Sequence, residues 1–381
     1  MAECSAEVAI VGGGIVGCAV AHALARCGVQ VLVLEAEPAL ALGASATNSG
    51  ILHTGFDSTP GELETRLILR AAELREELLG ELGVHTWRCG ARLTPRSDEE
   101  ADAVARLAAG AQRNGVERHV QADGSLVVPG ETVSDPVAFL YLLAAAAQQG
   151  GATVRLDARV TALTHTPAAG VELELASGER VQARAAVNCA GLFADEVAAM
   201  TGERVVEIYP RKGEFLVFAM PAQEPLEEIL LPVPSALGKG VLVFPTLDRS
   251  HVIAGPTARE REDKHDWSVE GDARELILAS AARMYPALEH AQYVGAYAGL
   301  RPAGRSANYV IARSRTMPGV VHVAAIRSTG LSASLAIGEH VAAMLAEDET
   351  VTLGPPRSLT AATQAVPPGR WWERAAAHRR R

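Results

Sequence analysis

The chain has 381 residues, enough for a large buried core and two domains, and a formal net charge of −10 at pH 7. This acidic balance argues against nucleic acid or an anionic membrane as the main partner, although a local site can still be cationic. The five cysteines form no C-x-x-C pair, which predicts reduced thiols in a cytoplasmic protein and no metal site. No leader pattern or spanning apolar run is present, so we expect neither a signal peptide nor a transmembrane segment. Peripheral membrane contact stays open.

A strand, a glycine-rich turn and a helix are predicted at the start of the chain. The apolar run at 8–11 predicts a buried strand, residues 15–26 predict a helix, and a second apolar strand follows at 29–34. Three glycines stand at G-x-G-x-x-G spacing between the first strand and the helix: Gly12, Gly14 and Gly17. This arrangement is typical of a dinucleotide site. The alternative is an ordinary βαβ unit whose glycines serve packing alone.

Each glycine of this motif has a physical task when a dinucleotide binds. Gly12 allows the tight turn, Gly14 lets the backbone approach a pyrophosphate, and Gly17 lets helix and strand pack closely. Glu35 ends the second strand at about the expected 20-residue spacing, where a carboxylate can bind both ribose hydroxyls. Because NADP would need a cation there, FAD or NAD is favoured.

The rest of the chain alternates between helices and strands. Further helices are predicted at 62–82, 98–114, 135–149, 273–285 and 330–345. Strands are predicted at 84–93, 154–164, 171–176, 181–188, 293–298, 309–312 and 320–326, and the segments 207–220 and 240–257 are expected to be strand-rich, with a turn at 248–250. The long loop after Glu35 is rich in Gly, Ser, Thr and Asn, which is typical of a functional loop. The basic segment 366–381 is interpreted as a solvated tail, with docking as the alternative.

Four stretches together form a recognisable pattern. They are VAIVGGGIVG with Glu35; GASATNSGILHTGFDSTPGELETRL; VNCAGLFAD with IYPRKGEFLVF; and GKGVLVFPTLD with YAGLRPAG and IRSTGLSASLAIGEHVAAML. The pattern resembles the D-amino-acid-oxidase/glycerol-3-phosphate-dehydrogenase family of FAD-dependent oxidoreductases. The A-S-x-x-N-S-G-I-x-H-x-G segment is similar to soluble glycerol-3-phosphate oxidases and dehydrogenases and to L-2-hydroxyglutarate oxidases. The continuation G-F-D-x-x-P-G favours the glycerol-phosphate branch.

The strands of the first βαβ unit are separated in the sequence from the NCAG segment and from the last strand–helix junction, and a domain assembled from three chain segments fits this order. The resemblance implies an α/β fold, α+β overall, in which a Rossmann-like FAD-binding domain accompanies a mostly antiparallel β substrate domain. The FAD-binding domain would consist of residues 1–82, 135–205 and 299–365, and the substrate domain of residues 83–134 and 206–298.

The resemblance also implies the reaction and its catalytic residues. Such enzymes move a hydride from a carbon bearing a hydroxyl to the flavin N5, while a base takes the hydroxyl proton. His53 matches the base, and histidine suits this task because it titrates near working pH. Arg301 at a strand end matches an arginine that grips a phosphate or carboxylate, for which its planar donors are suited. The alternatives are a structural loop histidine and an ordinary salt bridge.

Further substrate contacts follow from the same resemblance. Lys239, flanked by glycines, resembles a lysine that assists phosphate binding, and Ser49 is expected to face both substrate and cofactor. Arg211 and Lys212 either add positive charge to the site or form a solvated turn.

Two positions depart from the family pattern. Arg327 stands where the glycerol-phosphate enzymes often have an acidic residue, and Asn308 stands in a similar acid's place. These departures bear on the substrate more than on the reaction.

FAD is expected to bind without a covalent link. The loop after Glu35 would follow the cofactor from the pyrophosphate to the flavin ring, and the last helix would direct backbone N–H groups at the reduced flavin. Besides the four residues of the βαβ unit, the expected cofactor contacts are Ser45, Asn48, Ser49, Val160, Gly191, Thr329, Gly330 and Leu331. No cysteine follows Cys189, so we expect neither attachment through a C-terminal cysteine nor an iron–sulfur cluster.

Four functions are weighed on this basis. The first is oxidation of sn-glycerol 3-phosphate to dihydroxyacetone phosphate, and the second is oxidation of a 2-hydroxy acid such as L-2-hydroxyglutarate. The third is oxidation of an amine or amino acid, and the fourth is a nucleotide-binding protein without catalysis, against which the intact ATNSGILH stretch argues. The acceptor that reoxidises the flavin would be oxygen or a quinone.

Overall fold

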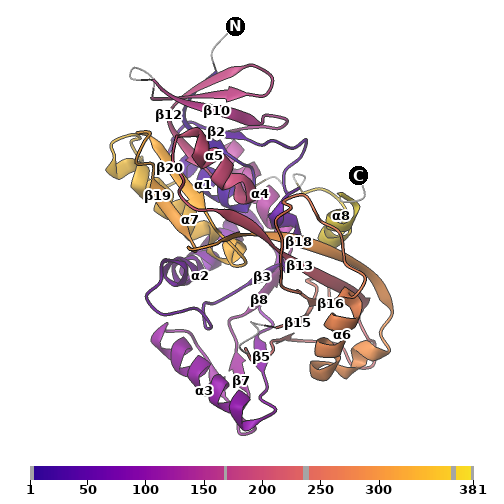
Figure 1. Cartoon of the computed structure of the whole chain (residues 1–381). Helices are drawn as coiled ribbons and strands as arrows, with labels where there is room; N and C mark the ends of the chain where they lie inside the picture. Colours follow the sequence, from indigo (N-terminus) through magenta and orange to yellow (C-terminus); the bar gives the residue numbers. More distant parts are fainter. Residues whose placement is uncertain (1–3, 167–169, 235–239, 362–365, 379–381) are drawn as a thin grey trace.

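The computed structural model describes residues 4–166, 170–234, 240–361 and 366–378 (Figure 1). An eight-stranded sheet with its helices occupies the upper part of Figure 1, and a nine-stranded sheet lies below it. This mixed architecture confirms the predicted α/β class, α+β overall. Within the described residues, no helix is both long and apolar enough to cross a bilayer.

The eight-stranded sheet is built around the first strand of the chain. Its members are β1 (Cys4–Val11), β2 (Val31–Leu34), β9 (Thr153–Arg155), β10 (Val160–Thr166), β11 (Gly170–Leu175), β12 (Arg180–Asn188), β19 (Val310–Arg313) and β20 (Val320–Ala324). Strand β1 pairs in parallel with β2 and β12, and β12 pairs in parallel with β20. Parallel strands are covered on both faces, which explains why β2 and residues 8–11 of β1 are continuous apolar runs.

Helices pack closely on this sheet and on one another. They include α1 (Ile15–Arg26), α2 (Leu63–Leu82), α4 (Pro136–Gln149), α5 (Ala194–Met200) and α7 (Gly330–Glu347). Helix α1 contacts α4 and α7, and α7 also contacts α2. The α1–α7 contact needs a glycine, because a Cβ on Gly338 would lie 2.5 Å from the carbonyl oxygen of Ala19.

The nine-stranded sheet is mostly antiparallel, as predicted. Its members are β5 (Ala91–Leu93), β6 (His119–Val120), β7 (Leu126–Val128), β13 (Ile208–Ala219), β14 (Ile229–Leu230), β15 (Leu242–Pro245), β16 (His251–Gly255), β17 (Arg259–Glu260) and β18 (Tyr293–Gly304). The exception is the parallel pair of β14 and β5. Helices α3 (Asp98–Arg113) and α6 (Ala273–Met284) accompany this sheet (Figure 1).

A small three-stranded sheet and three short 3-10 helices complete this part of the fold. The sheet contains β3 (Ile51–Leu52), β8 (Thr132–Ser134) and β4 (Thr86–Trp87), and the 3-10 helices are η1 (Ala44–Thr47), η2 (Gly191–Phe193) and η3 (Pro286–Glu289). In this small sheet β3 pairs with β8, so the loop after Glu35 is held beside residues 132–134. This pairing brings the segments around residues 53 and 131 together.

The predicted helices are found within two residues of their expected ends, whereas three strand predictions are wrong in extent. The strand expected at 154–164 is β9 and β10, separated by a bend in which Asp157 has φ +51°. The strand expected at 84–93 is divided into β4 and β5 by residues 88–90, where Gly90 has φ +75°. The strand expected at 293–298 continues to Gly304, because β18 stays paired with β13 along its length.

The extent of β18 changes two expectations. Arg301 lies inside this strand, opposite Arg211 of β13, and not at a strand end. The domain boundary expected at residue 299 falls within β18. The division into two domains stays a prediction.

The C-terminal segment is not a solvated tail. Residues 371–378 form α8 (Trp371–His378), in which Trp371, Trp372 and Ala375 are buried. Trp371 meets the ring of Tyr297 edge-on at a centroid distance of 5.4 Å. The prediction of a tail rested on the basic residues of the segment. Its two tryptophans have a large apolar area, which favours packing against the rest of the protein over exposure to solvent.

Candidate active site

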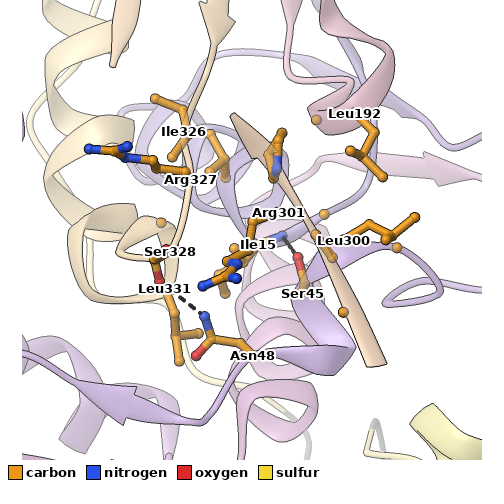
Figure 2. Close-up of a pocket in the computed structure, with 18 of the residues that line it drawn as sticks. Ile15, Ser45, Asn48, Leu192, Leu300, Arg301, Ile326, Arg327, Ser328 and Leu331 are labelled. Carbon is orange, nitrogen blue, oxygen red and sulfur yellow. Dashed lines mark hydrogen bonds between the residues drawn. The ribbon is translucent and has the colours of Figure 1, made fainter. Parts of the chain in front are cut away.

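A cavity of about 1080 Å³ is lined by residues from both large sheets and from the loop that contains η1. Figure 2 shows part of its wall, with Ser45 and Asn48 from the loop, Arg301 from β18, and residues 326–331 leading into α7. The volume slightly exceeds the range of about 300–1,000 Å³ that is usual for ligand pockets. It is therefore large enough for a sizeable cofactor together with a small substrate.

The turn between β1 and α1 forms one part of the wall. Gly12 has φ +105°, and a Cβ on it would lie 2.6 Å from the carbonyl oxygen of Cys189. A Cβ on Gly17 would lie 2.0 Å from the carbonyl oxygen of Gly12, so this glycine serves helix–strand packing and does not line the cavity. Gly14 lines the cavity at the N-terminus of α1. The turn thus presents bare backbone and a helix N-terminus, which together suit a phosphate.

Glu35 lies beside this turn. Its two carboxylate oxygens accept hydrogen bonds from the backbone N–H groups of Gly13, at 2.7 Å, and Glu37, at 3.0 Å. Burial raises the pKa of this carboxyl group, while the two N–H donors act in the opposite direction. Each oxygen keeps acceptor capacity for a further donor, such as a ribose hydroxyl.

Val160 and Gly191 line the cavity from β10 and η2. Gly191 has φ +58°, and no atom lies within 4 Å of the position that a Cβ would take. The backbone conformation there favours glycine, and the space in front of it stays open.

The loop at 44–49 makes hydrogen bonds to two separate parts of the cavity wall. Ser45 Oγ accepts a hydrogen bond from Ile15 N at 3.0 Å, and Asn48 Nδ2 donates to the Ser328 carbonyl at 3.3 Å (Figure 2). Ser49 lines the cavity and accepts from Ile51 N at 3.3 Å. The loop therefore connects the start of α1 with the segment before α7.

His53 follows β3 and lines the cavity. Its backbone N donates to Ser332 Oγ at 2.9 Å, and its carbonyl accepts from Arg75 Nη2 at 2.7 Å. Its ring Nδ1 lies 2.8 Å from Oε2 of Glu131, whose side chain is fully buried. An ionised carboxylate can only accept hydrogen bonds, so this contact favours the neutral tautomer in which Nδ1 would carry the proton and Nε2 would keep a lone pair.

Arg301 is held by backbone carbonyls. Its Nε donates to Arg211 O at 2.9 Å, and its Nη2 donates to Lys212 O at 3.2 Å and to Thr257 O at 2.9 Å. These hydrogen bonds fix the plane of the guanidinium, and among the described residues they leave Nη1 for another acceptor.

The charge around Arg301 is positive. Burial, together with the neighbouring cations Arg211 and Arg327, lowers the pKa of Arg301 to about 10. All three guanidinium groups line the cavity, and the buried Nε of Arg211 has no hydrogen-bond partner within the described residues. An anion bound here would offset the mutual repulsion of the three cations.

The start of α7 carries an acidic partner that the sequence did not reveal. Thr329, the N-cap residue, donates from Oγ1 to Glu64 Oε1 at 2.5 Å, and Asn308 donates from Nδ2 to the other oxygen of Glu64. Tyr309 completes the group with a 2.8 Å hydrogen bond between its hydroxyl and Thr329 Oγ1. Thus α2 supplies a carboxylate beside Asn308, where the family pattern led us to expect one.

The remaining predicted site residues differ in whether they reach the cavity. Gly330 and Leu331 line the cavity, and Lys239 lies outside the described residues. Lys212 is neither a free charge nor part of a solvated turn, because its fully buried Nζ lies 2.9 Å from Asp266 Oδ2.

Glu131, Arg75 and Glu64 were missed as site residues. The signal for Glu131 was a single charge in the otherwise apolar, extended segment at 126–134. Arg75 and Glu64 lie on a helix whose exposed face carries many charges, so the sequence did not single them out.

Comparisons with known proteins find a matching family model and several related sequences. A family model described as DAO, FAD dependent oxidoreductase, matches residues 7–344. The chain is 28% identical to a glycerol 3-phosphate dehydrogenase of Caloramator mitchellensis, over 88% of this chain and 72% of the relative. It is 26% identical to a glycerol 3-phosphate oxidase of Mycoplasma pneumoniae, over 87% and 92% of the two chains. It is 27% identical to an L-2-hydroxyglutarate dehydrogenase of Escherichia coli K12, over 73% and 70%.

The fold is shared with solved structures. A dithionite-reduced L-alpha-glycerophosphate oxidase from Mycoplasma pneumoniae with FAD bound superposes with a TM-score of 0.85 at 24% identity, over 94% of this chain and 99% of that one. A glycine oxidase from Bacillus cereus superposes with a TM-score of 0.78 at 19% identity, over 90% and 95%. At these identities the likeness concerns the fold alone.

Proposed function

Since the chain belongs to the DAO family of FAD-dependent oxidoreductases, we propose that it oxidises a small anionic secondary alcohol, namely sn-glycerol 3-phosphate, to the ketone dihydroxyacetone phosphate. One observation carries the proposal: His53, whose ring is bonded through Nδ1 to Glu131, and three guanidinium groups, those of Arg211, Arg301 and Arg327, line one cavity. The names of the relatives at 26–28% identity support the choice of substrate.

The cavity fits the cofactor of the family. The β1–α1 turn leaves no room for a side chain at Gly12, and Glu35 keeps acceptor capacity on both oxygens. Ser45 accepts a hydrogen bond from Ile15 N, so its own hydroxyl proton is available to a phosphate. When bound, FAD supplies the acceptor for the hydride that leaves the substrate carbon. No covalent link is proposed, because burial raises the pKa of the cavity-lining Cys189 thiol and so disfavours the thiolate.

The chain's own residues would divide the remaining work. Nε2 of His53 would take the hydroxyl proton as the carbon–hydrogen bond breaks, so that the alcohol becomes a ketone. Nη1 of Arg301 would hold the phosphate, with Arg211 and Arg327 adding charge. Ser49 and Lys239 remain proposed as further substrate contacts.

A 2-hydroxy acid is the second candidate. L-2-hydroxyglutarate is also a dianion, and Arg327 in place of an acid suits a second carboxylate as well as a phosphate. An amine is disfavoured, because three guanidinium groups would repel an ammonium group.

Anaerobic reduction of the flavin tests the proposal. Purified protein should be yellow, and sn-glycerol 3-phosphate should bleach the flavin band while 2-hydroxyglutarate and glycine leave it. Bleaching by 2-hydroxyglutarate alone would select the second candidate, and bleaching by amino acids alone would refute both. A protein that cannot be loaded with FAD would refute catalysis altogether.

The electron acceptor is proposed to be oxygen or a quinone. Hydrogen peroxide formation in air would identify the oxidase, and turnover with a soluble quinone but without peroxide would identify the dehydrogenase.

We also propose the cytoplasm as the compartment, which the free state of Cys18, Cys27, Cys89 and Cys189 supports. Peripheral membrane contact remains open to a quinone-dependent enzyme, and no nucleic-acid partner is proposed.

A further inference from the structure

We propose that Glu131 is a positioning residue that fixes the tautomer of His53 and thereby keeps Nε2 available as the proton acceptor. The inference rests on the base role proposed for His53, but the hydrogen bonds that motivate it are independent of any substrate.

Both carboxylate oxygens of Glu131 make hydrogen bonds to residues 53 and 54. Oε2 lies 2.8 Å from Nδ1 of His53, while Oε1 accepts from Thr54 N at 2.7 Å and from Thr54 Oγ1 at 2.8 Å. The side chain of Glu131 is 0% exposed, whereas that of His53 is 21% exposed toward the cavity. A buried acceptor on one side and open space on the other leave the imidazole one productive orientation.

A buried carboxylate is costly unless charge and hydrogen bonds compensate it. Glu131 has three donors, and Arg75 contributes a nearby positive charge. Arg75 also donates to the carbonyls of His53 and Ser332 at 2.7 and 2.8 Å, which holds the backbone of the histidine. The histidine is thus fixed at its ring, its carbonyl and its amide.

The geometry predicts what an isosteric amide would do. The backbone N–H of Thr54 can only donate, so the amide oxygen of Glu131→Gln must face Thr54. The amide NH₂ would then face Nδ1 of His53 and donate to it. Nδ1 would become the acceptor, the ring proton would move to Nε2, and the lone pair needed by the substrate would be lost. The variant removes only a charge and reverses one hydrogen bond.

The first test is kinetic. Glu131→Gln should slow anaerobic flavin reduction by ~10²–10⁴, as expected when a catalytic histidine is held in the wrong tautomer or loses its base function. The substrate concentration for half-saturation of that rate should change by no more than about threefold. In a His53→Ala background the same substitution should add no more than about threefold, because both changes remove one function.

A matched control exists in the same chain. Glu203 is a second nearly buried glutamate paired with a fully buried histidine, His322, at 3.2 Å, and neither residue lines the cavity. Glu203→Gln should lower stability but leave the flavin-reduction rate within about twofold of the parent. A comparable rate loss in both variants would assign the effect to destabilisation and overturn the proposal.

The second test needs no substrate, and its deciding measurement is made on the parent protein. In ¹⁵N-histidine-labelled parent protein, at a pH where the imidazole is neutral, His53 should show a protonated Nδ1 and an unprotonated Nε2. His53→Gln identifies the signals, and Glu131→Gln should exchange the two ring assignments. An Nε2–H tautomer in the parent protein would overturn the proposal even if sn-glycerol 3-phosphate bleaches the flavin. The expected tautomer without bleaching by any alcohol would instead refute the proposed function and leave the pair intact.

Discussion

Gly213 lies against the guanidinium group of Arg301. A Cβ on Gly213 would come within 3.1 Å of Nη2 and 3.3 Å of Cζ of Arg301, and within 2.8 Å of Cβ of Pro256. The two residues lie on the adjacent strands β13 and β18, two residues apart in register. The missing side chain therefore leaves the room that the guanidinium group needs to reach the three backbone carbonyls.

Gly213→Ala should displace the guanidinium of Arg301 from this position. We expect KM for the anionic substrate to rise about tenfold with a smaller change in kcat, because capture of the anion is weakened more than the chemical step. Steady-state kinetics measures both values. Gly295→Ala on β18 is the control, because a Cβ there meets no atom within 4 Å and should leave KM unchanged.

Arg301→Lys should weaken substrate capture more strongly, since a lysine cannot reproduce the planar set of hydrogen bonds to three carbonyls. Lysine keeps the positive charge but loses the oriented donor set, and we expect a roughly 10²-fold rise in KM. An altered kcat with an unchanged KM would contradict the role in binding.

The pH dependence of KM follows from the lowered pKa of Arg301, which is about 10. The guanidinium is cationic below this pH and loses its charge above it, so anion capture is present below pH 10 and weakens as the pH rises beyond it. KM of the parent enzyme should rise with pH in this range, whereas KM of Arg301→Ala should not show that rise. Measurements must use conditions in which the parent protein stays folded.

His53→Ala should slow anaerobic flavin reduction by ~10²–10⁴ if the imidazole takes the hydroxyl proton. The FAD content should stay that of the parent protein, because the ring of His53 is bonded to Glu131, outside the β1–α1 turn. The exposed His165 on β10 offers a control substitution. An unchanged reduction rate in His53→Ala would remove the base assignment.

Trp371→Ala should destabilise the protein by about 3–5 kcal/mol, the usual cost of truncating a buried large aromatic residue. Helix α8 also contacts η1, the 3-10 helix that contains Ser45. We therefore expect weaker retention of FAD together with the lower midpoint of denaturant unfolding. Glu373→Ala on the exposed face of α8 should change neither quantity, and equal effects of the two substitutions would argue against docking through the tryptophan.

The sequence by itself determined the elements whose signals are local. The G-x-G-x-x-G spacing, the apolar strands before and after it, and Glu35 at the end of the second strand all lie within about 30 residues, as a βαβ unit requires. Helix ends were predicted closely for the same reason, since Asp135 followed by Pro136 marks the start of a helix without reference to any other part of the chain.

Only the tertiary structure decided which distant charges meet. Glu131 reaches His53 across 78 positions of the sequence, and Glu64 reaches Thr329 across 265. Along the chain these residues look like solvated charges, because periodicity and turn chemistry report only on neighbours. Burial in the folded molecule removes their water and leaves each as the other's hydrogen-bond partner, which is the physical reason that the active-site pairs could not be predicted from the sequence.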